Sequence, residues 1–580
     1  MKHPDVTPAA KRRDIIRAGS RYYRRYYRLV ATATLITVAV ITGSLVVGDS
    51  VRTTLVRRVA ERLGDTESIL FARRSFLDEE FAAKWPAARG VLMVDGFVAH
   101  DGKHTPVTVW GVDDAAVPRG SVHINAPLAR ELDMKPSARR PVDLVLRLPA
   151  EGLVPSGSLF VTDTYTTSLR LQCDSLLDAR HGGNLSLRNE QTLPYNLFVN
   201  RAELAETLGA KGKINLLLSP RKLTTADLHA AWNYRMSGIT LHHGNGFTEI
   251  AADRLFLPDE VTRSITTRNH APNRLFSYLA NSLESLHSAD AVPYSFVTAL
   301  DTYDGEPLEP GDLILADYTA RRLRVGVGDT VRMSFFTAGD LKRLRTDSVA
   351  LRVKRIVPLA DLQADSTLTA RFPGMTDATR CTDWNSDLPI DMGRITAEDE
   401  LYWERYRTTP KALVSYAGLA PRWSNAYGNA TAVRVADTQP DLSLLRPEMM
   451  DIHLVHPREA GIYAARNGVD FAGLFLALGC FIIISALLLS VIPLAEMLYR
   501  RRGELALLTH LGYTPRRITA LLWREASPVV AVTALGGVVV GLGYTTVILW
   551  LLGNVWQGAT HTDGFSVYPA PLTIAVGLTV

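Results

Sequence analysis

The sequence predicts an α+β membrane protein. An α-helical transmembrane bundle of three complete spans and a truncated fourth carries a large α+β extracytoplasmic domain, inserted between spans 1 and 2. Three observations support this fold class. Three long stretches contain no charged residue. The segment between the first two stretches has both helix and strand patterns. Lysine and arginine cluster beside the apolar stretches in the way that membrane topology requires.

The three apolar stretches are each long enough to cross a bilayer, which takes about 20 apolar residues in a helix. They predict transmembrane helices 1, 2 and 3 at residues 29–47, 471–495 and 526–552. The first is expected to be an uncleaved anchor, because its apolar run is long for a signal peptide and no A-x-A-like cleavage site follows it. Residues 569–580 are apolar but too short to span. They are either an interfacial tail or, as we prefer, the start of transmembrane helix 4, continuing past the last residue.

Transmembrane helix 3 contains four glycines, at positions 536, 537, 541 and 543. Small residues allow membrane helices to approach closely. The glycines therefore favour a helix that packs against protein as well as lipid. The alternative is that glycine is simply common in membrane helices.

The basic residues predict the orientation of the chain. Residues 1–28 and 496–525 hold an excess of lysine and arginine, and such segments face the cytoplasm. Residues 48–470 and the short loop 553–568 are then extracytoplasmic. Alternating tyrosine and arginine just before helix 1 suits contact with lipid headgroups. The formal net charge of +5 follows from this topology and does not indicate a nucleic-acid-binding surface.

The extracytoplasmic region is long enough to form two cores. Residues 122–146, 197–218 and 313–335 predict three loose repeats of a strand–helix–strand unit, although such units are common enough to recur by coincidence. Residues 360–430 are rich in proline, glycine and aromatic residues, which predicts a long ordered segment packed by aromatic anchors. Cys173 and Cys381 could pair, but spacing alone does not decide this.

No catalytic, cofactor-binding or metal-binding motif is present. The sequence lacks the P-loop, H-E-x-x-H, C-x-x-C and G-x-S-x-G patterns. His242 and His243 are adjacent and not one helical turn apart, so we interpret them as part of a surface loop. The complete spans also lack the ionisable residues of a proton or ion pathway. We therefore expect a protein that is not an enzyme and binds no cofactor or metal.

The basic segment 496–525 predicts a short helix at its centre. Within Glu504–Leu511, the side chains of Leu505, Leu508 and Leu511 are expected on one side. Because the segment is compact and lies between two spans, it is expected to be a docking element for a cytoplasmic partner. An ordinary membrane-surface loop is the alternative.

The ends of this short helix are also encoded locally. Gly512 is suited to stop it in a left-handed conformation. Thr514 is a good N-cap and Pro515 a good first residue for the next helix, which runs into transmembrane helix 3. The sequence therefore predicts a helix, a tight glycine turn and a second helix.

At residues 501–518 the chain resembles the FtsX/MacB-type permeases of ABC transporters, whose cytoplasmic element follows a pattern like R-x-x-E-[IL]-A-x-L-x-x-L-G. The run Gly43–Arg52 is similar to the start of the large permeases of this group. The region that follows resembles their periplasmic core domain. Residues 471–580 would then be the permease domain.

The resemblance implies a permease subunit in a bacterial inner membrane, with its large domain in the periplasm. It implies a cytoplasmic ABC ATPase subunit as partner and a permease homodimer or heterodimer. ATP-driven motion of the spans would reach the periplasmic domain for export or extraction of a substrate, whose nature the resemblance does not give. The alternative is a membrane-anchored sensor or scaffold that regulates an extracytoplasmic partner without transport. The implied ATPase-coupling residues are Glu504, Leu505, Leu508, Leu511, Gly512 and Tyr513.

Overall fold

The structure, a computed structural model, describes residues 12–73, 76–113, 115–149, 166–178, 182–187, 193–338, 344–372, 375–376, 378–384, 389–468, 470–555 and 564–579. The chain forms two compact units. One consists mainly of residues 1–64 and 458–580, and the other contains most of residues 65–457.

The first unit is helical. Within its described residues, three stretches are long and apolar enough to cross a membrane: Arg24–Leu63, Pro457–Arg500 and Pro515–Asn554. They contain the three predicted apolar spans, and the helices α2, α12 and α14 each continue beyond the apolar part. The helices are α1 (Arg12–Tyr22), α2 (Arg24–Leu63), α11 (Pro457–Asn467), α12 (Phe471–Arg500), α13 (Arg502–His510), α14 (Pro515–Asn554) and α16 (Pro571–Thr579).

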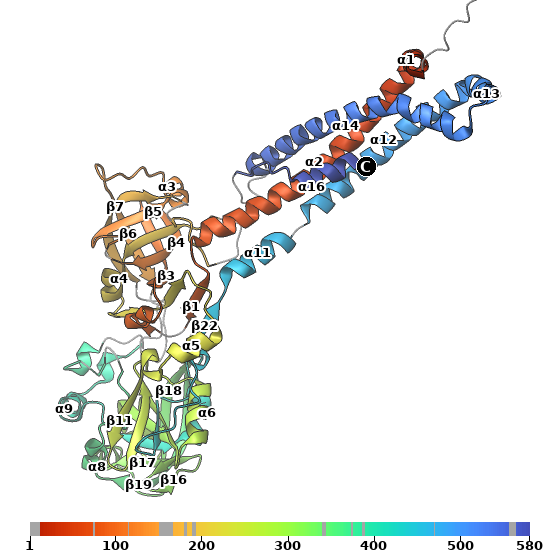
Figure 1. The fold of residues 1–580 in the computed structure, drawn as a ribbon. Helices are drawn as coiled ribbons and strands as arrows, with labels where there is room; N and C mark the ends of the chain where they lie inside the picture. Colours follow the sequence, from red (N-terminus) through yellow and green to blue (C-terminus); the bar gives the residue numbers. More distant parts are fainter. Residues whose placement is uncertain are drawn as a thin grey trace, which may run out of the picture. The chain divides into compact units, whose positions relative to one another are not determined.

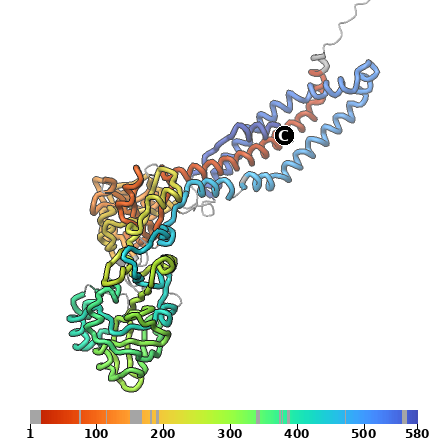
Figure 2. Tube along the Cα trace, turned by 60° about the horizontal axis from the view of Figure 1, so that its bottom comes forward, coloured from red at the N-terminus to blue at the C-terminus, as the bar shows by residue number. Residues whose placement is uncertain are grey.

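Helix α2 is the central helix of this unit and packs against α12, α14 and α16 (Figures 1 and 2). Two of the four glycines in α14 make the predicted close approach. A Cβ atom at Gly541 would lie 2.8 Å from the carbonyl oxygen of Ala39 in α2, and Gly537 is equally tight against the same helix. Gly536 makes only ordinary contact, and nothing lies within 4 Å of Gly543. The packing prediction is therefore correct for one face of the helix.

Helix α16 lies within the segment that the sequence suggested as the start of a fourth span, and it packs on α2. The Thr573 hydroxyl donates to the carboxylate of Asp49, and the backbone N–H of Tyr568 donates to the Ser50 hydroxyl over 2.9 Å. The run Gly43–Arg52 thus includes the residues that hold α16.

The second unit contains two sheets of nine strands each, counted over the described residues (Figure 1). The first has the order β22-β1-β10-β3-β4-β8-β5-β7-β6, and the second β11-β12-β21-β13-β14-β20-β17-β19-β18. The first sheet is built from β1 (Ser68–Ala72), β3 (Arg89–His100), β4 (Lys103–Val112), β5 (Ser121–Asn125), β6 (Val142–Pro149), β7 (Thr166–Leu177), β8 (Asn196–Asn200), β10 (Leu216–Ser219) and β22 (Ile452–Val455). The second is built from β11 (Ile239–Gly244), β12 (Phe247–Ala252), β13 (Asn273–Ser285), β14 (Ala291–Leu300), β17 (Asp312–Ala316), β18 (Thr330–Ala338), β19 (Leu344–Val357), β20 (Ala412–Ser415) and β21 (Ala432–Val435).

The two sheets have the same topology. In the first, β3 also pairs with β6, which closes six strands into a barrel, and β13 pairs with β18 in the same way in the second. The strand directions agree as well. Two pairs are parallel in each barrel: β4–β8 and β5–β7 in the first, and β14–β20 and β17–β19 in the second. Two further equivalent pairs are antiparallel: β5–β8 and β6–β7 in the first, and β17–β20 and β18–β19 in the second.

The predicted repetition is present, but the repeated unit is a whole barrel. Residues 122–146 and 313–335 form β5–α3–β6 and β17–α7–β18, which occupy equivalent places. Residues 197–218 form β8–α4–β10, and their equivalent is β20–α10–β21 at residues 412–435, which the sequence did not reveal. The helices of this unit are α3 (Ala126–Glu131), α4 (Arg201–Thr207), α5 (Thr225–Ala231), α6 (Asp259–Arg268), α7 (Asp317–Leu323), α8 (Leu359–Ala364), α9 (Ala397–Tyr406) and α10 (Tyr416–Trp423).

Buried asparagines start two of these short helices. The side chain of Asn125, at the end of β5, accepts a hydrogen bond from the backbone N–H of Leu128, and Asn200, at the end of β8, accepts one from Glu203. An asparagine in this position satisfies a helix N–H that would otherwise lack a partner. A strand followed by a capped helix is thus encoded locally in the first barrel.

The two sheets differ in the origin of one edge strand. In the second sheet, β11 and β12 are consecutive and form a hairpin. In the first, the equivalent edge position beside β1 is taken by β22, which comes after the whole second barrel. The chain therefore returns from the second barrel to finish the first. As a result, the strand that follows α2 and the strand that precedes α11 are antiparallel neighbours.

The segment between β19 and β20 is the predicted aromatic excursion. Its side chains pack onto Phe296 of β14, with ring-centroid distances of 5.1 Å to Phe372 and 6.1 Å to Trp403. Trp384 stands edge-on to Trp403 at 4.9 Å. These residues belong to the core of the second barrel, so the aromatic anchoring is confirmed for the described residues. The prediction covered residues 360–430, of which 373–374, 377 and 385–388 lie outside the described residues. From residue 412 the predicted excursion is instead part of the barrel, as strand β20 and helix α10.

The pairing of Cys173 and Cys381, which the sequence left open, does not occur. Both are buried free thiols, one in β7 of the first barrel and the other in the excursion of the second. The interpretation of the two adjacent histidines is corrected. His242 and His243 lie in edge strand β11 and not in a loop. The His243 Nδ1 atom is 3.2 Å from the Thr248 hydroxyl, an ordinary cross-strand contact in a hairpin.

Candidate coupling site

The predicted helix, turn and helix between the second and third spans are present. Helix α13 (Arg502–His510) follows α12 directly, and α14 begins at Pro515 (Figure 1). Gly512 has a φ angle of +87°, the left-handed stop that the sequence predicted. Thr514 has the extended backbone of an N-cap, but its side chain makes no capping hydrogen bond. The turn therefore depends on Gly512 and on Pro515 at the first helical position.

The predicted coupling residues lie on different sides of α13. Leu505 and Leu508 are half-buried, so they face back toward the protein, whereas Leu511 is 68% exposed. Leu507, which the sequence analysis did not select, is 60% exposed. Because residues four apart are neighbours on a helix surface, Leu507 and Leu511 form the exposed apolar surface at this turn, here called the leucine pair.

The remaining predicted residues shape the turn itself. Glu504 is exposed and its carboxylate lies 3.0 Å from Arg501. Tyr513 is half-buried, and its backbone N–H donates to the carbonyl of Leu508 over 3.0 Å. This bond accompanies the left-handed glycine and satisfies a carbonyl at the end of α13.

A buried ion pair lies behind α13. Arg501 Nη1 donates to Glu525 Oε2 over 2.9 Å, and the side chains are 4% and 0% exposed. Arg501 is the residue between α12 and α13, and Glu525 is in the third turn of α14. The sequence did not predict this pair. Both residues looked like ordinary members of a charged cytoplasmic segment, and no short spacing connects them.

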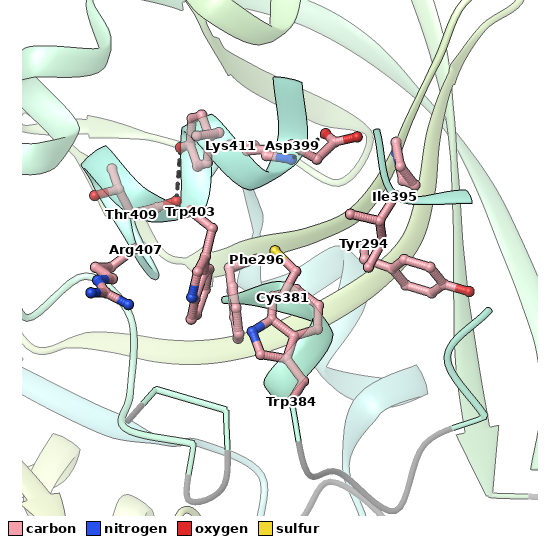
Figure 3. A pocket seen from close by; sticks show the side chains of 12 residues that line it. Tyr294, Phe296, Cys381, Trp384, Ile395, Asp399, Trp403, Arg407, Thr409 and Lys411 are labelled. Atoms are coloured by element: carbon pink, nitrogen blue, oxygen red, sulfur yellow. Dashed lines mark hydrogen bonds and ion pairs between the residues drawn. The ribbon is translucent and has the colours of Figure 1, made fainter. Parts of the chain in front are cut away.

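A second group of buried charges lies in the second barrel, beside a small cavity of about 20 Å³ (Figure 3). Asp399 of α9 contacts Arg322 at 2.5 Å and Lys411 at 3.5 Å. Burial lowers the pKa of the Lys411 ammonium to about 8. Burial would raise the pKa of Asp399, but Lys411 and Arg322 hold it below its usual value.

This cavity has room for about one water molecule and none for a metabolite. Five of its twelve lining residues are aromatic, including Trp384, Tyr402 and Trp403. Over the part of the chain that the structure describes, no group of three or more histidine, cysteine or acidic residues is placed to hold a metal ion. The cavity is therefore part of a packed core, and α13 remains the stronger candidate for function.

Comparison with known families matches the C-terminal part of the chain. Residues 475–580 fit the family model of the FtsX-like permease C-terminal domain. The match supports an FtsX-type permease of an ABC-type system. This family is generally non-enzymatic and in general implies an ABC ATPase partner. The match begins within α12 and includes α13, α14 and α16, so the candidate coupling site lies inside it. Together with the three long apolar helices, it indicates a membrane protein. No curated protein sequence matches the chain.

Proposed function

We propose that this protein is the permease subunit of an FtsX/MacB-type ABC complex, with α13 as the site where a cytoplasmic ATPase docks. The observation that carries the proposal is the leucine pair on a short helix held between two spans. An exposed apolar pair on a helix fixed at both ends is the type of surface that a groove in a partner receives.

The proposal extends to topology and assembly. Residues 1–28 and 496–525 face the cytoplasm of a bacterial cell, and residues 48–470 form the periplasmic region. Two permease subunits assemble with two ATPase subunits, and lipid covers the remaining apolar faces of the spans. Nucleotide-driven movement of α13 passes through the spans to the two barrels and drives export or extraction of a substrate. The basic residues of the N-terminal and α13 segments support the orientation.

The test is co-purification of the protein with a candidate cytoplasmic ABC ATPase. The variant Leu507→Glu/Leu511→Glu replaces the leucine pair with charges. Loss of an apolar anchor from a packed pocket costs about 2–4 kcal/mol, so association should weaken at least about tenfold. Gly512→Val should act in the same direction, because a β-branched residue strains the left-handed turn.

Thr509→Glu is the matched control, since it adds a charge to the exposed opposite side of the same helix. It should leave ATPase association unchanged. Wild-type association by the double leucine variant would refute α13 as the docking site. Failure of the wild-type chain to bind any ABC ATPase would instead favour a sensor or scaffold without an ATPase.

A further inference from the structure

Arg501 joins three helices at one buried point. Its Nη1 atom donates to Glu525 of α14, and its Nε atom donates to Glu504 of α13 over 3.0 Å. Its guanidinium carbon lies 4.5 Å from the ring centroid of Tyr23, the residue that precedes α2. A planar guanidinium suits such a junction, because it presents several donors in a fixed fork and also stacks on aromatic rings.

The partner carboxylate is enclosed as tightly. Glu525 is fully buried, and a Cβ atom on Gly19 of α1 would lie 2.6 Å from its Oε1 atom. Tyr23, Tyr27 and Met497 form a small apolar cluster at the same place. Helix α1 therefore approaches α14 at Gly19, where only a glycine leaves room for the Glu525 carboxylate.

Stability alone is a weak reason for this arrangement. Removing two charges from water costs about as much as their attraction returns, and apolar residues of similar volume are often equally stabilising. What a buried, forked ion pair supplies is a defined geometry. The neighbouring pair Arg500–Glu496 has a similar N–O distance, 2.7 Å, but its side chains are 63% and 45% exposed. Water therefore competes with each charge for its partner, and the pair does little to hold the two side chains in one geometry.

We propose that Arg501 is a positioning residue that locks α13, α14 and the start of α2 into one rigid body, so that a displacement of α13 moves the first and third spans together. The inference rests on the proposed function, because it gives the docking helix a route into the spans. It concerns a different surface from the leucine pair, so the two ideas can fail separately.

The experiment measures the distance between spin labels at exposed positions 22, beside Tyr23, and 509, on α13. The full chain is used in detergent, alone and with a candidate ATPase. Arg501→Met/Glu525→Leu replaces the buried pair with apolar side chains that preserve packing. Arg500→Met/Glu496→Leu makes the same replacements in the exposed pair, one residue away, and is the matched control.

We expect one narrow distance in the wild type and in the control, with and without nucleotide. The Arg501→Met/Glu525→Leu variant should lose this single distance and still bind the ATPase, because its leucine pair is intact. A purely structural role predicts instead either the wild-type distance or an unfolded protein. If this variant does not fold, Arg501→Lys keeps the charge without the fork and should also lose the narrow distance.

A wild-type distance distribution in the variant that folds would overturn the inference, whether or not an ATPase binds. The labels are read first in the chain alone, so the result does not depend on the partner. Absence of ATPase binding by the wild type would count against the proposed function and leave the measurement of the rigid body intact.

Discussion

Replacing Asp399 with asparagine should destabilise the second barrel strongly. Asp399 is the shared partner of two buried cations, Arg322 and Lys411, whose side chains are 15% and 5% exposed. Asparagine has the same shape but no charge, so Lys411 loses the counter-charge that Asp399 supplies inside the core. Arg322 keeps the more exposed carboxylate of Glu398, 3.4 Å away. Removing one partner of a buried ion pair costs about 3–5 kcal/mol, because an uncompensated charge remains.

The substitution also removes a carboxylate from a helix cap, and this effect needs its own control. Asp399 forms a capping box with Thr396 at the start of α9, and Asp227 forms the same box with Thr224 at the start of α5. Asp227 is exposed, and the cation that acts on it, Arg221, is exposed as well. Asp227→Asn therefore removes the cap alone and should cause only a small loss of stability.

The assay is unfolding of the full chain in detergent, followed by tryptophan fluorescence, since Trp384 and Trp403 line the cavity beside Asp399. A loss of about 3–5 kcal/mol lowers the melting temperature of a barrel of this size by roughly 6–20 °C. The reasoning is refuted if Asp399→Asn and Asp227→Asn differ by less than about 1 kcal/mol, because the buried cations would then have found other compensation.

Three further predictions follow from other parts of the molecule. Lys411→Met should remove a pH dependence of the free energy of unfolding. The pKa of Lys411 is about 8 in the folded chain and about 10.4 in the unfolded chain, so between these values the unfolded chain binds more protons. The wild type should therefore gain stability relative to the variant as pH rises from about 8 to 10. Equilibrium unfolding across that pH range measures it, and parallel curves would contradict it. Gly541→Leu should loosen α14 from α2 and lower the melting temperature in detergent. Gly543→Leu should not, because nothing lies within 4 Å of a Cβ atom there. If both variants lower the melting temperature equally, the close approach at Gly541 is not the cause of the loss. In a cysteine-free background, Glu306→Cys should react with an impermeant thiol reagent on intact cells, and Thr509→Cys should not. Protection of the cysteine at position 306 would contradict the proposed orientation.

The sequence was informative wherever the physical constraint is local. A hydrocarbon layer demands a long apolar run, so the three helices that are long and apolar enough to cross it were visible directly. A left-handed turn favours glycine, so the stop at Gly512 was predicted from one residue and its neighbours. Strand–helix signals at residues 122–146, 197–218 and 313–335 were real, because each depends on short patterns of burial and capping.

What the sequence did not reveal depends on contacts between distant residues. Barrel closure is a pairing of β3 with β6 and of β13 with β18, and nothing in either strand alone encodes its partner. The face of α13 that remains exposed depends on how the helix is held, so the sequence did not show that Leu507 is exposed while Leu505 and Leu508 are half-buried. Arg501 and Glu525 are 24 residues apart in the sequence, and their charges were indistinguishable from the others in the same basic segment.

The antiparallel pairing of β1 with β22 has a mechanical consequence. Ser68 at the start of β1 and Val455 at the end of β22 lie at the same end of the ladder, and the chain continues from them to α2 and α11. If both attachments are pulled equally along the strands, the ladder is not strained and the sheet follows as a solid body. If one is pulled further than the other, the difference shears every hydrogen bond of the ladder at once, which is the direction in which a short sheet resists most. The pairing of β1 with β22 therefore resists any motion that slides the chain entering β1 past the chain leaving β22.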